Sequence, residues 1–417
     1  MSLLKNSWLN ILGLAIPSLV AIPTMAYMAR TLERETFGLF TLAIAFIGYS
    51  AIFDGGLSRA VIREVSIYRE DPAETQKIVG TATRVSIFLG IAVCLLMALL
   101  SGSITNLLNV SDTIYKDANL GISVLSLCIP LVLVTASLTS LMEGREDFRS
   151  INIIRAIGFS LVFLIPLLLT IYERSFFSLA GGLVIARLLM LGLTYWLYFS
   201  TSRVHPIQFN REVLLRLYRF GSWMTVSNVV SPVMEYFDRF LIASIRGSAT
   251  VIYYTAPAEM TTRLLSVPGA VSRSLFPAIS NRIQADSRAL VLRALRYQLI
   301  VVSAISAFVI VFAQDILRLW LGAEFALESR DVLIWLMVGF FFNGIATIPF
   351  THLQASGNAR LTAIIHLTEI VPYLLLLYLM ITNFGLVGGA AAWSMRVALD
   401  CALMSYFSLR VLNTTHE

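Results

Sequence analysis

The chain has 417 residues, of which 57% are apolar and 13% charged, with a mean hydropathy of +0.79 and a formal net charge of +6. A soluble domain is typically about half apolar and about a quarter charged, so this composition excludes an ordinary soluble enzyme and indicates a membrane protein. The positive charge requires no nucleic acid partner, because loops that face anionic lipid headgroups are themselves basic.

Uncharged stretches fill the chain almost from end to end. A helix needs roughly 20 apolar residues to cross a bilayer core of about 30 Å, and continuous apolar runs favour helices over the alternating strands of a barrel. The predicted fold class is therefore an all-α membrane protein with about twelve transmembrane helices. In chain order the predicted spans are 8–29, 36–57, 80–101, 118–142, 151–171, 176–199, 219–245, 251–275, 291–313, 331–353, 359–380 and 385–409.

Basic residues gather on one side of the predicted membrane. When successive spans alternate in direction, most of the 31 Lys and Arg residues fall in the connections on the same side as the N-terminus. The positive-inside rule then predicts that both termini are cytoplasmic.

The sequence predicts no cofactor. Cys94, Cys128 and Cys401 all fall inside predicted spans and lack the spacing of metal ligands. No P-loop, zinc-ligand, G-x-S-x-G or dinucleotide fingerprint occurs, so the chain does not use ATP through a P-loop.

The two halves of the chain resemble each other. Ser7-Trp8 near the start of the first predicted span corresponds to Ser222-Trp223 in the seventh. Two halves of the same orientation are parallel repeats, and their substrate site lies between them near the midplane. The predicted domains are an N-terminal six-helix bundle over 1–200, a cytoplasmic linker over 201–219 and a C-terminal six-helix bundle over 220–417.

Four arginines lie inside the predicted spans, where a charge costs about 2.5–3.5 kcal/mol on insertion scales and usually faces a cavity or a partner. The planar guanidinium binds oxyanions bidentately and keeps its charge when partly dehydrated, so it suits a diphosphate. The predicted diphosphate and sugar site comprises Arg187, Arg239, Arg263 and Arg396. For Arg187, which has no partner nearby in sequence, snorkelling toward the surface is the alternative.

Carboxylates accompany these arginines and could bind H⁺ or Na⁺, which would couple transport to an ion gradient. The predicted ion-coupling residues are Asp54, Glu235, Asp238, Glu259 and Glu369. Helical spacing also favours pairing within one helix, as for Glu259 with Arg263 and for Arg396 with Asp400. The alternative is that such pairs only fix helix packing, and that Asp54 simply lies at the membrane interface.

Five segments in a fixed order resemble the Wzx-type flippases of O-antigen repeat units, a family in the superfamily that also contains multidrug extruders and the lipid II flippase. They are MARTLERETFGLFTLAIAF, IFDGGLSRAVIREVS, LMEGREDFRSINIIRAIG, YFDRFLIAS and YYTAPAEMTTRLLSVPGAVSRSLFPAIS. The resemblance covers nearly the whole chain. Within these segments it points to Asp54, Asp238, Arg239, Glu259 and Arg263.

The resemblance implies two helical bundles around a cationic cavity in a bacterial inner membrane. It implies that an undecaprenyl-diphosphate-linked oligosaccharide moves from the cytoplasmic to the periplasmic leaflet by alternating access, driven by a gradient of H⁺ or Na⁺. Membrane lipids, a polysaccharide polymerase and a chain-length regulator are the further partners that it suggests, and the chain itself is not an enzyme.

Two other functions remain open at this stage. A multidrug or cation antiporter of the same fold would need a more acidic and aromatic site, which the four arginines inside the predicted spans disfavour. A membrane polysaccharide polymerase or ligase would carry a large external loop with catalytic polar residues, and no predicted loop is that long.

Overall fold

A computed structural model of the chain describes residues 17, 19–202, 209–280 and 284–414. These residues form helices and contain no strand. The helices are α2 (Arg34–Tyr49), η1 (Ser50–Asp54), α3 (Leu57–Ile67), α4 (Pro72–Leu99), α5 (Ser101–Leu107), α6 (Tyr115–Leu125), α7 (Cys128–Gly144), α8 (Phe148–Leu169), α9 (Phe176–Ser202), α10 (Arg211–Arg246), α11 (Ile252–Leu264), α12 (Ser266–Ser280), α13 (Gln284–Val311), α14 (Ala313–Trp320), α15 (Ala323–Ala355) and α16 (Ala359–Thr414). Residues 19–31 are also helical, whereas Ser7-Trp8 lies outside the described residues.

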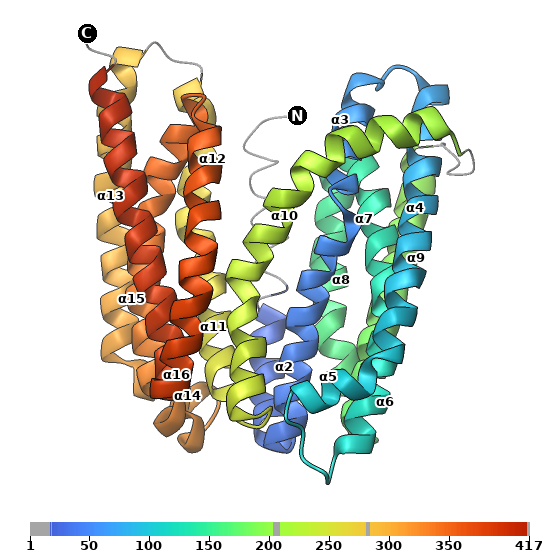
Figure 1. Ribbon diagram of the computed structural model, residues 1–417, viewed down its shortest axis with the longest axis vertical. Coiled ribbons are helices and arrows are strands. Elements are labelled where there is room, and N and C mark those ends of the chain that lie inside the picture. Colours follow the sequence, from blue (N-terminus) through green and yellow to red (C-terminus); the bar gives the residue numbers. More distant parts are fainter. Residues whose placement is uncertain (1–16, 18, 203–208, 281–283, 415–417) are drawn as a thin grey trace. The chain divides into compact units, whose positions relative to one another are not determined.

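The helices form two compact units, residues 1–240 and 241–417 (Figure 1). The change from one unit to the other falls inside α10. This helix begins at Arg211, so the second part of the predicted linker 201–219 is helical and continuous with the predicted seventh span. The domain boundaries expected from the sequence remain a prediction.

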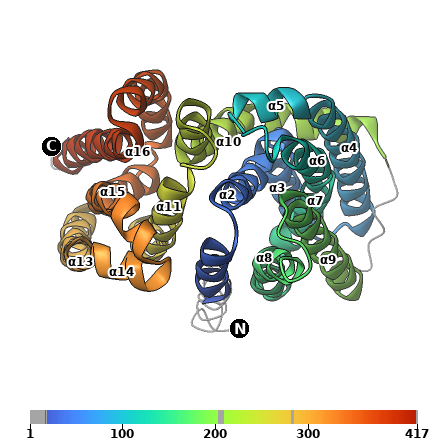
Figure 2. The ribbon, with the colours of Figure 1, turned by 90° about the horizontal axis from the view of Figure 1, so that it is seen from below.

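In the first unit, pairs of long helices enclose an apolar core. Helix α8 packs along α9, α4 along α7, and α6 against α9 (Figure 2). Val61 and Val65 of α3, Leu138 and Leu141 of α7 and Leu217 of α10 share one buried cluster. The amino-terminal part of α10 is thereby part of the first unit's core.

In the second unit, α15 packs against α16, α13, α12 and α11. Helix α16 contains a break at Gly385 (φ 63°, ψ −139°), a backbone conformation that favours glycine, so α16 consists of two arms. Carbonyls before a helix break lose their helical donors. Arg246 supplies replacements, because its Nη2 donates to Ile381 O at 3.1 Å and Thr382 O at 2.9 Å.

Short polar side chains define where several helices start. The Asp71 carboxylate accepts from the backbone N–H groups of Ala73 and Glu74, both at 3.0 Å, directly before Pro72 opens α4. Asn210 accepts from the N–H of Glu212 at 2.8 Å and so caps α10. Such caps satisfy N–H groups that have no partner within the helix, which explains why these helices begin where they do.

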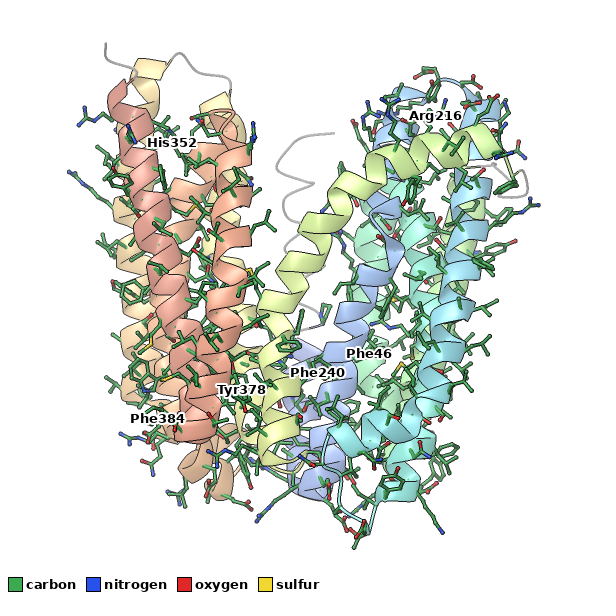
Figure 3. All side chains as sticks on the ribbon, in the orientation of Figure 1. Phe46, Arg216, Phe240, His352, Tyr378 and Phe384 are labelled. Carbon is green, nitrogen blue, oxygen red and sulfur yellow. The ribbon has the colours of Figure 1, made fainter. Side chains whose placement is uncertain are left out.

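Eight of the described helical segments are long and apolar enough to cross a membrane. Large apolar side chains project outward from them (Figure 3), and Phe88 and Leu99 of α4 are 73% and 83% exposed. Exposed apolar side chains of this density suit a lipid environment. The prediction of an all-α, multi-pass membrane protein is confirmed, and the count of about twelve spans remains a prediction.

Glycines allow some helices to approach each other closely, and Gly90 provides a test. A Cβ at Gly90 would lie 2.5 Å from the Pro130 Cα, so Gly90→Ala must push α4 away from α7. We expect a loss of about 1–3 kcal/mol, as for other overpacked sites, seen as a lower melting temperature of the purified protein. The control is Gly192→Ala on α9, where nothing lies within 4 Å of the added Cβ. Equal melting temperatures of the Gly90→Ala and Gly192→Ala variants would contradict the close packing of α4 against α7.

Candidate functional site: charges buried in the helices

Arg187 is a buried arginine in the middle of α9. Its side chain is 9% exposed, and its guanidinium lies 5.9 Å from the Phe159 ring. Within the described residues its guanidinium makes a weak hydrogen bond from Nη1 to the Met190 sulfur at 3.5 Å, and its Nε has no acceptor. Within the described part of the chain, no carboxylate lies within ion-pair distance of Arg187. A buried cation without a counter-ion is costly, and an anionic ligand would remove that cost.

Asp54 has a local structural role. Its Oδ1 accepts from the Gly56 N–H at 2.7 Å and its Oδ2 from the Ser58 N–H at 3.3 Å. Gly55 and Gly56 both have positive φ, at 58° and 76°, so they form a tight turn between η1 and α3. The carboxylate therefore caps α3, and ion coupling at Asp54 is not needed to explain why it is there.

Asp238 and Arg239 are adjacent on α10 at the end of the first unit. Both are almost fully buried, with exposures of 4% and 1%. The Arg239 guanidinium lies 4.9 Å from the Tyr236 ring, and its backbone N–H donates to the Asp238 carboxylate at 2.7 Å. Glu235, the third predicted residue of this helix face, has a side chain outside those that the structure describes.

Glu259 and Arg263 pair along α11 in the second unit. The Arg263 Nη2 lies 3.8 Å from the Glu259 Oε2, and both side chains are largely buried. This is the spacing of i and i+4 on one helix face, as the sequence predicts. The separation exceeds hydrogen-bond distance, so this ion pair is loose.

Glu369, Arg396 and two further polar residues gather between the arms of α16. Glu369 is 5% exposed, and neither of its carboxylate oxygens has a hydrogen-bond partner. The Arg396 guanidinium lies 5.3 Å from the Tyr373 ring. His366 Nε2 approaches Asp400 Oδ1 at 3.3 Å, joining the two arms. The sequence had suggested that Asp400 pairs with Arg396 along one helix, but in the described chain its ion pair is with His366.

Not all predicted residues come together. Glu259 meets Arg263 on α11, and Glu369 shares the α16 hairpin with Arg396. Among the described side chains, Arg187 and Asp54 have no polar contact with another predicted site residue. The described residues also contain no group of three or more His, Cys, Asp or Glu side chains that could hold a metal ion.

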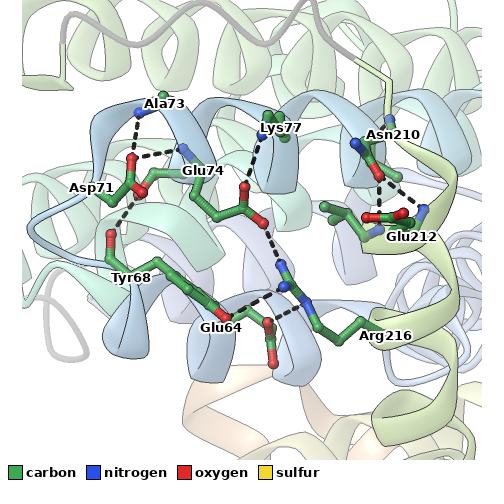
Figure 4. Close-up of polar contacts among 12 residues, drawn as sticks. Glu64, Tyr68, Asp71, Ala73, Glu74, Lys77, Asn210, Glu212 and Arg216 are labelled. Carbon is green, nitrogen blue, oxygen red and sulfur yellow. Dashed lines mark hydrogen bonds and ion pairs between the residues drawn. The ribbon is translucent and has the colours of Figure 1, made fainter.

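A polar network that the sequence did not reveal lies where α3, α4 and α10 meet (Figure 4). Arg216 of α10 places its Nε 2.8 Å from Glu64 Oε2 and its Nη2 2.7 Å from Glu74 Oε1. Its guanidinium also lies 4.9 Å from the Tyr68 ring, and Lys77 binds the second oxygen of Glu74 at 3.1 Å.

The network fixes the start of α10 to the first unit. Partial burial opposes the charge of Arg216, but its hydrogen bond to Glu74 and the charge of Glu64 raise its pKa above the ordinary value. Arg216 therefore stays charged at any physiological pH. Each of these residues looks like an ordinary charge beside a span, and Arg216 is 142 residues from Glu74 in the chain, so only the fold could reveal the network.

Comparison with known proteins places the chain among polysaccharide transporters. Residues 27–330 match the polysaccharide biosynthesis protein family. The chain is 37% identical over 412 residues to a candidate O-antigen transporter of Shigella flexneri, a match that covers 99% of each protein. It is 25% identical over 271 residues to the lipopolysaccharide biosynthesis protein WzxC of Escherichia coli (strain K12), which covers 64% of this chain and 52% of that protein.

The fold also matches a solved transporter. The chain superposes on an inward-facing multidrug resistance MATE family transporter of the MOP superfamily with a TM-score of 0.79. The match covers 97% of this chain and 98% of that one, with 16% sequence identity. At this identity the likeness shows a shared fold and nothing about the substrate.

Proposed function

The chain belongs to the polysaccharide biosynthesis protein family as a Wzx-type flippase of the MOP superfamily, and we propose from this premise that it carries an O-antigen-type repeat unit across the membrane. The repeat unit is linked to undecaprenyl diphosphate and moves from the cytoplasmic to the periplasmic leaflet of a bacterial inner membrane. The observation that carries the proposal is the buried charge of Arg187, which has no acidic partner in the described part of the chain.

The substrate's chemistry suits this site. A diphosphate is the one strongly anionic part of a polyprenyl-linked sugar, and its oxygens match the planar donor fork of arginine. Arg187, Arg239, Arg263 and Arg396 are the proposed diphosphate and sugar ligands. The polyprenyl tail needs no protein site, because it stays in the lipid.

Alternating access would expose the site first to one leaflet and then to the other. The excess of Lys and Arg in alternate connections supports cytoplasmic termini, with the substrate entering from that side. An H⁺ or Na⁺ gradient would drive the cycle through buried carboxylates. Of the predicted set, Glu369 is the one whose described environment supports that role best, since Asp54 is already used as a cap. A polysaccharide polymerase and a chain-length regulator remain predicted partners.

The competing functions have less support. The chain is a transporter and not a polymerase or ligase, since its family and its structural neighbours are transporters. A multidrug antiporter rests on the shared fold alone, and a buried arginine without a counter-ion would repel cationic drugs.

Complementation tests the proposal in cells. We expect the chain to restore surface polysaccharide in a strain that lacks its own O-antigen transporter and makes the matching repeat unit. Gels of extracted lipopolysaccharide measure the result. If the protein reaches the membrane in normal amounts without restoring polysaccharide, while conferring drug resistance, the antiporter would replace the flippase.

Arg263 gives a residue-level prediction in the same strain. Arg263→Ala should reduce surface polysaccharide strongly, because it removes the guanidinium from α11 and breaks the ion pair with Glu259. Arg263→Lys should rescue only partly, since an ammonium cannot bind oxyanions bidentately. Glu259→Gln is the control for loss of the ion pair alone. Wild-type polysaccharide in both Arg263 variants would remove this residue from the site.

A further inference from the structure

The α16 hairpin contains a carboxyl group that the fold leaves without a partner. Glu369 lies ten residues into the first arm, about 15 Å along the helix axis at 1.5 Å per residue, which is well inside a bilayer core. Its side chain is 95% buried, with 5% of its surface exposed, and both carboxylate oxygens lack a hydrogen bond. Glu369 is therefore a buried acidic group whose oxygens the described protein atoms do not satisfy.

Among the described residues, the charged and titratable groups that act on Glu369 lie within the α16 hairpin itself. Asp400, Arg396 and His366 interact with it electrostatically. Arg396 and Asp400 lie on the second arm of α16, whereas His366 lies one helical turn before Glu369 on the first arm. No ion pair joins Arg396 to Glu369 among the described contacts, because the guanidinium lies instead against the Tyr373 ring.

The neighbouring helices add few titratable groups. Helix α15 contributes Phe350, whose ring stacks on His366 at 5.7 Å, and His352, whose Nδ1 lies 2.9 Å from Ser408 Oγ. Helix α11, which also contacts α16, carries the pair Glu259 and Arg263. These groups already have partners. The buried atoms of the hairpin cluster without a hydrogen bond therefore include both carboxylate oxygens of Glu369, Arg396 Nε and Asp400 Oδ1, and Glu369 is the residue with neither oxygen satisfied.

The charges of the hairpin do not cancel by themselves. Of the groups that act on Glu369, Arg396 is the permanent cation, so the two carboxylates of Glu369 and Asp400 face one positive charge until a proton is bound. A buried ionised carboxylate without hydrogen bonds is unfavourable, and adding one proton removes the charge that makes it so. We propose that the α16 hairpin is a site for one proton, held by Glu369 in this conformation, and that Arg396 becomes the counter-ion of Glu369 when the proton leaves.

A proton fits this site better than a metal cation. Hard cations require several oxygen ligands, whereas the guanidinium of Arg396 and the ring of His366 occupy the same cluster. No set of three or more metal-ligating side chains occurs in the part of the chain that the structure describes. His366 lies beside Asp400 and its ring can bind a proton, so it offers the proton a second position in the hairpin.

This inference names the coupling ion of the proposed function and rests on that function only for its role in transport. A neutral Glu369 leaves the Arg396 guanidinium free to move, whereas an ionised Glu369 would hold it. Binding and release of one proton would then change the position of a charge that is a proposed substrate ligand. Proton movement and substrate binding would thereby be linked in one hairpin.

The protonation state can be measured without any transport assay. Infrared spectra of the purified full-length protein in lipid nanodiscs should contain the carbonyl stretch of a buried protonated carboxylic acid at neutral pH. Glu369→Gln should remove that band, while the exposed Glu328→Gln should leave it. The band should disappear at alkaline pH and be unaffected by adding Na⁺ at constant pH. A spectrum without a band that depends on Glu369, or a band that Na⁺ abolishes, would overturn the proton site.

Arg396 provides the second arm of the test. Arg396→Gln removes the positive charge that would stabilise ionised Glu369. The infrared band of protonated Glu369 should therefore persist to a more alkaline pH than in the parent protein. His366→Gln should shift the transition less, because it removes only the alternative proton position. An unchanged transition in Arg396→Gln would refute the exchange between proton and guanidinium. If the infrared results hold while the chain fails to restore surface polysaccharide, the proton site stands and the flippase proposal fails.

Discussion

Replacing Arg187 with alanine is expected to abolish export of the repeat unit while leaving the protein folded. A charge-assisted hydrogen bond is worth about 1.5–3 kcal/mol, and 1.4 kcal/mol corresponds to tenfold in affinity. Loss of the guanidinium should therefore weaken diphosphate binding by roughly ten- to a hundredfold. Surface polysaccharide in the complemented strain and binding of undecaprenyl diphosphate to the purified protein measure the effect.

The thermal stability of the protein should not fall when Arg187 is replaced, although transport is lost. Removing a buried charge usually destabilises a protein because the opposite charge is left buried and unpaired. Arg187 has no acidic partner among the described residues. Arg187→Met, which keeps most of the side-chain volume, should therefore melt at or above the temperature of the parent protein while losing transport. Arg187→Lys keeps the charge without the planar fork and should retain part of the activity. Normal export by Arg187→Met would show that the buried charge has no role in the substrate site.

The second large effect is expected at Arg216, this time on stability. Arg216→Met removes two ion pairs and leaves Glu64, whose side chain is 3% exposed, with only Arg63 beside it at 3.1 Å. Breaking a fully buried pair costs about 3–5 kcal/mol, but Arg216 is partly exposed and screened, so we expect about 2 kcal/mol. Thermal melting of the purified protein measures the loss.

A double variant separates the network from simple truncation. Replacing both partners of a buried pair with apolar residues is often nearly neutral, so Glu64→Leu with Arg216→Met should be more stable than Arg216→Met alone. The matched control is Arg211→Met at the start of α10, where the side chain is exposed. If the effects of the two substitutions simply add, Arg216 does not stabilise the fold through Glu64.

Much of the fold follows from the sequence because lipid leaves few options. Long apolar runs must be helical to satisfy their own backbone, so the all-α class and most helix positions could be predicted. The helix boundaries were harder to predict. Helix α4 begins at Pro72 and α15 at Ala323, each eight residues before the corresponding predicted span. Polar first turns outside the lipid core cost little, and hydropathy does not detect them.

The candidate site was only partly predictable. Local spacing correctly placed Glu259 beside Arg263, since an i, i+4 pair depends on one helix alone. The same rule was wrong for Asp400, whose partner His366 comes from the other arm of α16. Asp54 could have been recognised as a cap, because Asp before Gly-Gly at the start of an amphipathic helix is a turn and N-terminus signal. Pairing across helices depends on packing, and a single sequence does not encode it visibly.

The central claim is that this chain moves a lipid-linked, diphosphate-bearing oligosaccharide. The most direct test is translocation of undecaprenyl-diphosphate-linked oligosaccharide in proteoliposomes, with and without an imposed pH gradient, measured by access of the sugar to an external glycosidase. The proposed mechanism predicts transfer that requires the gradient and is lost in Arg187→Ala and Glu369→Gln. Transfer that is absent with the parent protein, or unchanged in the Arg187 variant, would contradict it.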